Sequence, residues 1–187
     1  MKLHETIIPG CFEIEYISRE DARGSFVKTF HSTAFREMGL EADFLESFFS
    51  YSHRNVLRGM HFQLPPADGA KLVYCMQGHV LDVALDLRVG SPAYGEYASF
   101  ELSAKKASAA YIPRGVAHGF CTLEADSAVV YHVSSEYDSK LDTGLLWNSF
   151  GFPWPGNAPV ISERDSRFAS FRDFKGPFRF ERKEIDI

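Results

Sequence analysis

Apolar and polar residues alternate along much of this chain, most clearly between Val80 and Arg88. Every second position of that segment is apolar: Leu81, Val83, Leu85 and Leu87. The positions between them are mostly polar: Asp82, Ala84, Asp86 and Arg88. A period of two residues predicts a β-strand with one apolar and one polar face. Residues 71–76 predict the preceding strand, and Gln77-Gly78 predicts the turn that joins the two as a hairpin.

Further short strands are predicted between turn-rich segments, at residues 97–102, 109–112, 118–123 and 128–134. Short strands at this spacing are typical of an all-β sandwich or barrel. One short helix is predicted, with Ser32 as its N-cap, Phe35 and Met38 within it and Gly39 at its end. A length of 187 residues without repeats or linkers favours a single domain, 1–187. We expect its barrel core at about residues 20–150 and a C-terminal extension at about 151–187.

The C-terminal extension differs from the rest, because phenylalanines alternate with charged residues. They stand at positions 168, 171, 174, 178 and 180, among seven Lys or Arg and six Asp or Glu. Aromatic and basic residues together can bind single-stranded nucleic acid. Here the acidic residues nearly cancel the basic ones, so we expect the phenylalanines to pack on the barrel or on a partner.

Composition excludes several classes of protein. A net charge of −5 and a pI near 5.8 argue against a nucleic-acid binder, which needs a basic surface. Cys11, Cys75 and Cys121 are too few and too far apart for a disulfide framework or a structural zinc site. No segment predicts a signal peptide or reaches the ~18 apolar residues of a membrane span. We therefore expect a cytoplasmic protein with buried thiols and no membrane contact.

Two histidines stand beside glycines at predicted strand edges, His61 in the segment LRGMHFQ and His118 in PRGVAHGF. Inward-facing residues of distant strands converge in a barrel, so both can line one pocket, although each can equally be a structural histidine. Two histidines and a carboxylate can hold iron. Barrels of that kind usually carry His-x-His on one strand, and position 63 is Gln. A metal site is therefore the less favoured alternative, and we predict none.

A possible ion pair joins the two strands of the predicted hairpin. Lys71 opens the first strand, and Asp82 lies on the polar face of the second. Opposite charges that face one another across a hairpin can pair. A buried lysine held by a carboxylate stays protonated and can polarise a carbonyl group. The alternative is an ordinary surface ion pair, which contributes under ~1 kcal/mol.

Together these segments resemble the dTDP-4-dehydrorhamnose 3,5-epimerase family, in order from about residue 10 to 165. The matching segments are DARGSF (21–26), SYS (50–52), VLRGMHFQ (56–63), KLV (71–73), GHVLDVALDLR (78–88), SP (91–92), IP (112–113), AHGF (117–120), Tyr131, WN (147–148) and ISERD (161–165). The resemblance implies a jelly-roll (cupin-like) barrel with short peripheral helices that forms a homodimer and uses no metal or other cofactor. It also implies an epimerase that acts on a nucleotide-diphosphate-linked 4-keto-6-deoxyhexose and inverts carbon 3, carbon 5 or both.

The resemblance assigns four catalytic roles. His61 is the base that removes a proton next to the ketone, and Asp165 orients it. Tyr131 is the acid on the opposite face of the sugar ring, as inversion requires. Lys71 lies at the ketone oxygen and is supported by Asp82. Enolate formation next to a carbonyl needs a base, an acid and a cation of this kind.

The resemblance also implies a set of substrate-binding residues. Arg58 and Arg23 bind the pyrophosphate, since a guanidinium group matches phosphate oxygens. Arg23 can reach the site of the neighbouring subunit, which would make the dimer functional. The other residues expected near the substrate are Phe26, Gln63, His118 and Trp147.

The match fails at three neighbouring positions. Lys28 stands where the family often has glutamate, and Glu46 and Phe48 replace glutamine and asparagine. These positions lie on the nucleotide side in the family, so we count Lys28 and Glu46 as substrate-binding and expect a nucleotide other than thymidine, or thymine held differently. The alternative is neutral drift.

Four other functions remain open from the sequence. Two keep the fold and the substrate class: a mono-epimerase and a keto-isomerase of a non-thymidine nucleotide sugar. The others are a metal-dependent cupin enzyme and a non-catalytic sugar-binding jelly roll.

Overall fold

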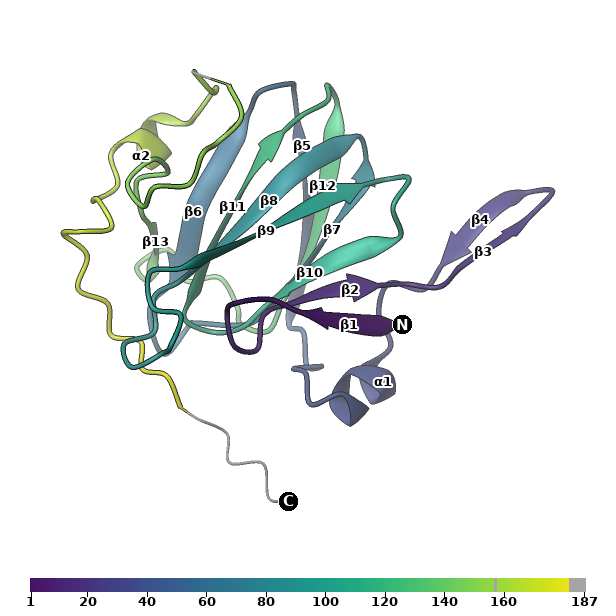
Figure 1. The fold of residues 1–187 in the computed structure, drawn as a ribbon, viewed down its shortest axis with the longest axis horizontal. Helices are drawn as coiled ribbons and strands as arrows, with labels where there is room; N and C mark the ends of the chain where they lie inside the picture. Colours follow the sequence, from purple (N-terminus) through teal and green to yellow (C-terminus); the bar gives the residue numbers. More distant parts are fainter. Residues whose placement is uncertain (157, 182–187) are drawn as a thin grey trace.

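Two antiparallel β-sheets packed face to face form the body of the protein in the computed structural model, which describes residues 1–156 and 158–181 (Figure 1). The first sheet contains, in spatial order, β1 (Lys2–Glu5), β2 (Phe12–Glu15), β10 (Ser108–Ile112), β7 (Lys71–Gln77), β12 (Ser127–Val133) and β5 (Glu46–Ser52). The second contains β13 (Asp142–Gly144), β6 (Leu57–Gln63), β11 (Val116–Thr122), β8 (His79–Asp86) and β9 (Tyr97–Ser103). The remaining elements are the hairpin of β3 (Ser18–Asp21) and β4 (Gly24–Val27) and the helices α1 (Ser32–Glu37) and α2 (Glu163–Ser166). The predicted all-β class is confirmed.

The main apolar core lies between the two sheets. Val73 and Val129 of the first sheet and Ala84 and Phe120 of the second are fully buried in it. A second apolar cluster covers the outer face of the second sheet beneath the C-terminal segment, and a third covers the outer face of the first sheet beside α1. Each sheet therefore packs against the other sheet on its inner face and against an apolar cluster on part of its outer face.

The alternation predicted for β8 is present, but the prediction that β7 and β8 form a hairpin is wrong. Val83 and Leu85 pack under the C-terminal segment, whereas Asp82 and Ala84 are buried on the inner side. β7 pairs with β10 and β12, and β8 pairs with β9 and β11 in the other sheet. Gly78, with φ +79, thus turns the chain between the sheets. Alternation marks a strand but carries no information about its partner.

The barrel core begins earlier in the chain than the predicted boundary at about residue 20, because β1 and β2 already belong to the first sheet. β2 pairs with both β1 and β10, and Ile8 and Ile14 are fully buried. Strands of four residues are too short for alternation to identify them. The single-domain organisation itself stays a prediction.

The predicted short helix is present as α1, but its cap differs. His31 is the N-cap and makes no side-chain cap hydrogen bond, so the prediction of Ser32 as the cap is wrong. Phe35 is buried, and Gly39, with φ +72, follows the helix as predicted. The packing of Phe35, rather than capping, therefore holds this short helix.

The phenylalanines of the C-terminal segment pack on the barrel, as predicted. Phe174 and Phe178 contact Phe62 of β6 edge-on, at centroid distances of 5.1 and 5.6 Å. Phe180 lies 5.1 Å from the guanidinium carbon of Arg88, which is itself paired with a buried aspartate. In Figure 1 this segment runs along the side of the barrel that carries β6 and β13.

A histidine without a polar partner lies on the outer face of the first sheet. The Nε2 atom of His132 (β12) is buried and has no hydrogen-bond partner among the described residues. Phe30, Phe44 and Tyr74 surround its ring at centroid distances of 6.2, 5.9 and 5.9 Å. Burial lowers the pKa of His132 below its ordinary value of 6.5.

His132 should make the protein less stable in mild acid. Because its pKa is lower in the folded protein, the unfolded chain binds the proton more readily, and the free energy of unfolding falls as the pH drops below about 6.5. We expect the melting temperature of the wild type to fall more between about pH 7 and 5.5 than that of His132→Phe. His31→Gln, which changes an exposed histidine next to α1, should keep the wild-type dependence. An equal pH dependence in His132→Phe would contradict this assignment.

Candidate active site

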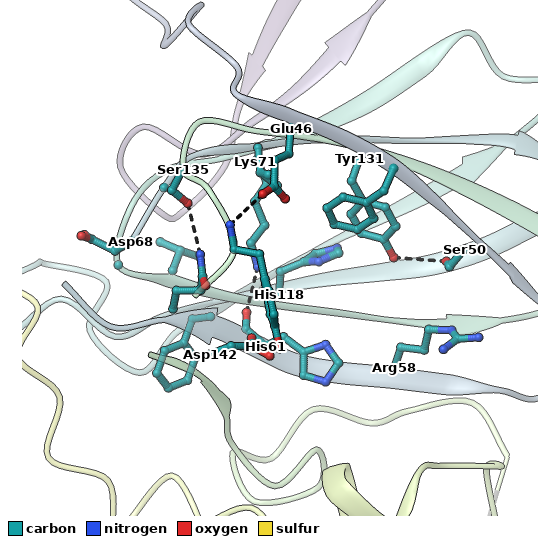
Figure 2. Close-up of a pocket in the computed structure, with 18 of the residues that line it drawn as sticks. Glu46, Ser50, Arg58, His61, Asp68, Lys71, His118, Tyr131, Ser135 and Asp142 are labelled. Carbon is teal, nitrogen blue, oxygen red and sulfur yellow. Dashed lines mark hydrogen bonds between the residues drawn. The ribbon is translucent and has the colours of Figure 1, made fainter. Parts of the chain in front are cut away.

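A cavity of about 370 Å³ opens between the two sheets (Figure 2). Seven of the residues predicted from the sequence line it: Glu46, Arg58, His61, Gln63, Lys71, His118 and Tyr131. Two more lie behind the lining, where Asp165 is bonded to His61 and Asp82 to His118. The structure thus brings together residues separated by more than 100 positions in the chain.

A bulge in β6 turns both Arg58 and His61 toward the cavity. Residues three apart in a regular strand face opposite sides. Here His118 pairs with His61 but Phe120 pairs with Arg58, so β6 contains one extra residue. Gly59 occupies the bulge with φ +141, and a Cβ there would lie 2.5 Å from the Cα of Gly119. The RGMH spacing is therefore a structural requirement of the cavity wall.

Gly59→Ala should destabilise the protein strongly, by about 2–4 kcal/mol, because it combines backbone strain with a backbone clash. Thermal or denaturant unfolding measures the change. Gly24→Ala is a matched control, since Gly24 also has a positive φ, +116, but nothing lies within 4 Å of its added Cβ. Equal losses in the two variants would show that the close approach of β6 and β11 is not the cause.

His61 is held by a buried carboxylate. Its Nε2 lies 2.9 Å from Oδ1 of Asp165, and the backbone N–H of Gly59 donates to Oδ2 at 3.2 Å. Burial alone would raise the pKa of Asp165, but the hydrogen bonds and charge of His61 and the bond from Gly59 outweigh it, and the pKa is lowered. An ionised Asp165 accepts the Nε2 proton, which leaves Nδ1 of His61 as a base.

Asp165 is positioned by the short helix α2. Ser162 is the N-cap of α2, and its hydroxyl oxygen accepts a hydrogen bond from the backbone N–H of Asp165 at 3.0 Å. Phe168, just beyond α2, packs edge-on against the ring of His61 at 5.9 Å. The ISERD segment therefore forms a small cap that orients the imidazole from behind.

Lys71 enters the same cavity from β7. Its Nζ donates a hydrogen bond to the backbone carbonyl of His61 at 3.0 Å (Figure 2). Burial lowers the pKa of Lys71 to about 8, against the opposing charges of Asp142 and Asp82. At neutral pH the side chain is therefore mostly a cation, which can stabilise negative charge on a nearby oxygen.

The predicted direct pair between Asp82 and Lys71 is not formed. Its Oδ2 lies 2.7 Å from Nε2 of His118, and its Oδ1 is buried without a hydrogen-bond partner among the residues described. The two strands belong to different sheets, so the hairpin geometry on which the predicted pair depended does not exist. Burial lowers the pKa of His118 more than Asp82 raises it, so His118 is a neutral donor to Asp82 at pH 7.

Tyr131 faces His61 from the opposite sheet. It is 8% exposed, and its hydroxyl lies 3.5 Å from the hydroxyl of Ser50. Burial raises the pKa of Tyr131, so the phenol keeps its proton throughout the physiological range. A protonated phenol on one wall and an imidazole on the other can exchange protons with the two faces of a flat substrate.

Four predicted binding residues lie away from this cavity. Arg23, Phe26 and Lys28 are exposed on or just after the β3–β4 hairpin, which projects from the barrel (Figure 1). Arg23 is bound there by Asp21, with 2.6 Å between Nη2 and Oδ2. Trp147 packs against the outer apolar cluster and is not among the residues that line the cavity.

The sequence reasoning missed a second layer of charge beside Lys71. Asp142 lines the cavity and opposes the lowering of the Lys71 pKa, and Arg164 binds Asp142 with an N–O distance of 2.6 Å. The neighbouring stretch also contributes Ser135 and Tyr137 to the cavity wall. These residues lie in a loop and a three-residue strand without regular spacing, so no sequence pattern marked Asp142.

Over residues 1–156 and 158–181, no group of three or more His, Cys, Asp or Glu side chains is arranged to hold a metal ion. Over the same residues, no helix is both long and apolar enough to span a membrane.

Comparison with known proteins identifies the family. A family profile described as dTDP-4-dehydrorhamnose 3,5-epimerase matches residues 5–173. The chain belongs to this family. The dTDP-4-dehydrorhamnose 3,5-epimerase of Shigella flexneri is 36% identical over 176 residues, which cover 92% of this chain and 97% of that protein. The predicted family and its isomerase class are confirmed.

Solved structures of other epimerases have the same fold. An epimerase from Legionella pneumophila in complex with dTDP-4-keto-L-rhamnose gives a TM-score of 0.92 at 29% identity, covering 97% of this chain and 99% of that one. A 3'-monoepimerase from Streptomyces bikiniensis in complex with dTDP-quinovose gives 0.85 at 30% identity, covering 89% and 86%. The expected jelly-roll, cupin-like class is confirmed.

Two departures from the expected pattern of the epimerase family lie on β5, beside the cavity. Glu46 accepts a hydrogen bond from the backbone N–H of Tyr137 at 2.8 Å, and Phe48 stacks on Tyr131. Both residues line the cavity wall. They therefore change the site itself, and not only a distant surface.

Proposed function

We propose that the protein is an epimerase of a nucleotide-diphosphate-linked 4-keto-6-deoxyhexose and inverts carbon 3, carbon 5 or both. One observation carries the proposal: His61 and Tyr131 lie on facing sheets and line one cavity together with Lys71. Inversion needs a base on one face of the sugar ring and an acid on the other. Membership of the epimerase family supports the same chemistry.

Proton removal is the first step of the proposed reaction. His61, oriented by Asp165, takes a proton from a carbon next to the ketone. The electrons of that C–H bond form the enolate, and negative charge develops on the ketone oxygen. The Lys71 cation stabilises that oxygen, and the Asp165 carboxylate stabilises the imidazolium of His61.

Protonation from the other side completes the inversion. Tyr131 donates its phenol proton to the same carbon, and the ketone re-forms. The phenolate then takes a proton from solvent, and His61 releases its proton, so no other reactant is consumed. The raised pKa of Tyr131 supports this role because the phenol is fully protonated before each turnover.

Arg58 is proposed to bind the pyrophosphate at the mouth of the cavity. Its side chain is exposed there, and Ser52 fixes it by accepting from Nε at 3.0 Å. Gln63, Glu46 and His118 are the remaining polar groups on the cavity wall for which we propose substrate contacts. Glu46 offers a carboxylate where the family pattern has an amide, which supports a nucleotide other than thymidine or a different mode of holding thymine.

Proton NMR in D₂O tests the proposed reaction. The purified protein is mixed with thymidine-linked 4-keto-6-deoxyglucose, and the loss of the signals of the protons on carbons 3 and 5 is followed. Exchange at both carbons with inversion supports the 3,5-epimerase. The same experiment with cytidine, guanosine and uridine counterparts identifies the preferred base, and much faster turnover of the thymidine compound would refute the expected change of base. No exchange with any of these nucleotides would refute the proposed function.

Inversion of one carbon alone, mono-epimerisation, is the narrower form of this proposal. It is supported by the similarity to the Streptomyces bikiniensis 3'-monoepimerase, whose fold covers most of this chain. Exchange confined to one carbon in the same NMR experiment would select it.

We also propose that the protein is a homodimer in which the β3–β4 hairpin reaches the partner's cavity. Among the described residues, β3 and β4 form a separate two-stranded sheet, and Arg23 and Phe26 on this hairpin are exposed. Their exposure supports a contact with another chain.

A mixing experiment tests the shared site. We expect Arg23→Gln and His61→Asn, each impaired alone, to recover activity when co-expressed, because one site of each mixed dimer then has both native residues. Failure to recover activity, or a monomer in sedimentation, would refute the shared site.

The expected cytoplasmic location is part of the same proposal. It is supported by the three cysteines, which are buried and unpaired, as in proteins of a reducing compartment.

A further inference from the structure

A phenylalanine covers the buried tyrosine of the cavity. Phe48 (β5) is the register partner of Tyr131 (β12), and both side chains line the cavity. Their rings are stacked, with centroids 4.8 Å apart and planes 18° from parallel. Phe48 is 48% exposed, whereas Tyr131 is 8% exposed. Phe48 therefore lies between the tyrosine ring and the open edge of the first sheet.

Packing, rather than hydrogen bonding, fixes the ring of Tyr131. Among the residues that the structure describes, its hydroxyl has a single polar contact, with Ser50 at 3.5 Å, which is longer than the usual distance of a hydrogen bond between hydroxyls. Phe48 covers one face of the ring, and His118 meets the ring edge-on at 5.9 Å and 76°. Loss of the Phe48 ring would let the phenol move and would admit water to it.

We propose that Phe48 is a positioning residue, which holds the hydroxyl of Tyr131 toward the substrate and keeps water from the exposed side of its ring. The inference rests on the proposed function, because the position of Tyr131 matters most when it delivers a proton. Asparagine, which the family pattern often has at this position, offers no ring to stack on the phenol. Phe48 therefore gives this site a control on protonation that an amide would not supply.

The step that depends on Phe48 is protonation of the enolate. The O–H bond of Tyr131 breaks, the electron pair of the enolate C=C bond forms the new C–H bond, and an oxygen lone pair re-forms the ketone. A displaced phenol slows this step but not proton removal by His61 on the facing sheet. The enolate then regains a proton from the His61 side, so the carbon exchanges with solvent without inverting.

The test compares inversion with exchange in D₂O. We expect Phe48→Asn to lower the ratio of inversion to deuterium exchange about tenfold, since small misplacements of a catalytic group have effects of at least this size. Phe48→Tyr, which can still stack, should restore a ratio close to that of the wild type. Phe49→Asn is the matched control, because Phe49 is the next residue of β5 and is 69% exposed, and it should leave the ratio unchanged. In a Tyr131→Phe background, Phe48→Asn should lower the ratio no further.

Three results would overturn the proposal. They are an unchanged ratio in Phe48→Asn, equal loss of exchange and inversion, and a further loss in the Tyr131→Phe background. Carbon-13 NMR of labelled tyrosine provides a readout without substrate: the resonance missing in Tyr131→Phe should shift in Phe48→Asn and not in Phe49→Asn. If the wild type exchanges no proton with any nucleotide sugar, the proposed function fails, and an unshifted resonance in Phe48→Asn would still show that Phe48 does not stack on Tyr131 in solution.

Discussion

His61→Asn is expected to lose proton exchange at both carbons next to the ketone, by about 10²–10⁴-fold. Asparagine keeps a polar side chain at this position, but its amide ends near the place of Nδ1 and does not reach Asp165, whose Oδ1 lies 2.9 Å from Nε2 of His61. It has no group that accepts a proton at neutral pH. The rate of deuterium uptake in D₂O measures the loss, and the melting temperature should stay near that of the wild type.

The pair of His61 and Asp165 should behave as one unit. Asp165→Asn alone should also slow exchange, and the double variant should be no slower than His61→Asn. His53→Asn is a suitable control, because its side chain is 87% exposed and lies outside the cavity lining. More than a tenth of wild-type exchange in His61→Asn would remove His61 as the base.

Lys71→Met should reduce exchange by about 10²–10³-fold, the usual effect of removing a group that stabilises an oxyanion. Methionine has a similar length and no charge, so the cavity keeps its shape while the ketone oxygen loses its cation. Removing a lysine that burial disfavours should leave the melting temperature unchanged or higher. Exchange within tenfold of the wild type would show that another group stabilises the enolate.

The pH profile separates charge from shape at Lys71. The pKa of Lys71 is lowered to about 8, so the cation is present below that pH and is lost as the pH rises through it. We expect kcat/KM of the wild type to fall on the basic side with a pKa near 8. Lys71→Arg keeps its charge to much higher pH and should move this limb upward, whatever its absolute rate. A basic limb that stays near 8 in Lys71→Arg would belong to another group.

The sequence predicted individual strands better than their partners. Alternation correctly marked most of β7 to β12, because each of these strands is long enough for two or three repeats of the period. No strand was predicted for β1 to β4, which have four residues each, or for the seven-residue β5, and the predicted pairing of β7 with β8 was wrong. A strand covered on both faces has the same sequence pattern beside any neighbour, so topology needs the three-dimensional structure.

The candidate site divides in a similar way. Motifs identified the side chains that carry chemistry, including His61 and Tyr131, because the epimerase family assigns a definite role to the residue at each of these positions. They did not reveal the extra residue in β6 that turns Arg58 inward, nor the charge of Asp142 near Lys71. Such features depend on register and on loops, which no local spacing in a single sequence determines.

The two sheets also determine how far apart the reacting groups stand. Packed β-sheets are about 10 Å apart, and His61 and Tyr131 belong to opposite members of this pair. The separation of the two sheets therefore leaves room for one flat ring between a proton acceptor and a proton donor. Core residues such as Phe120 and Val129 set that separation, although neither lines the cavity. The architecture itself thus favours two-sided proton transfer, and the choice of sugar and nucleotide is left to the side chains at its edge.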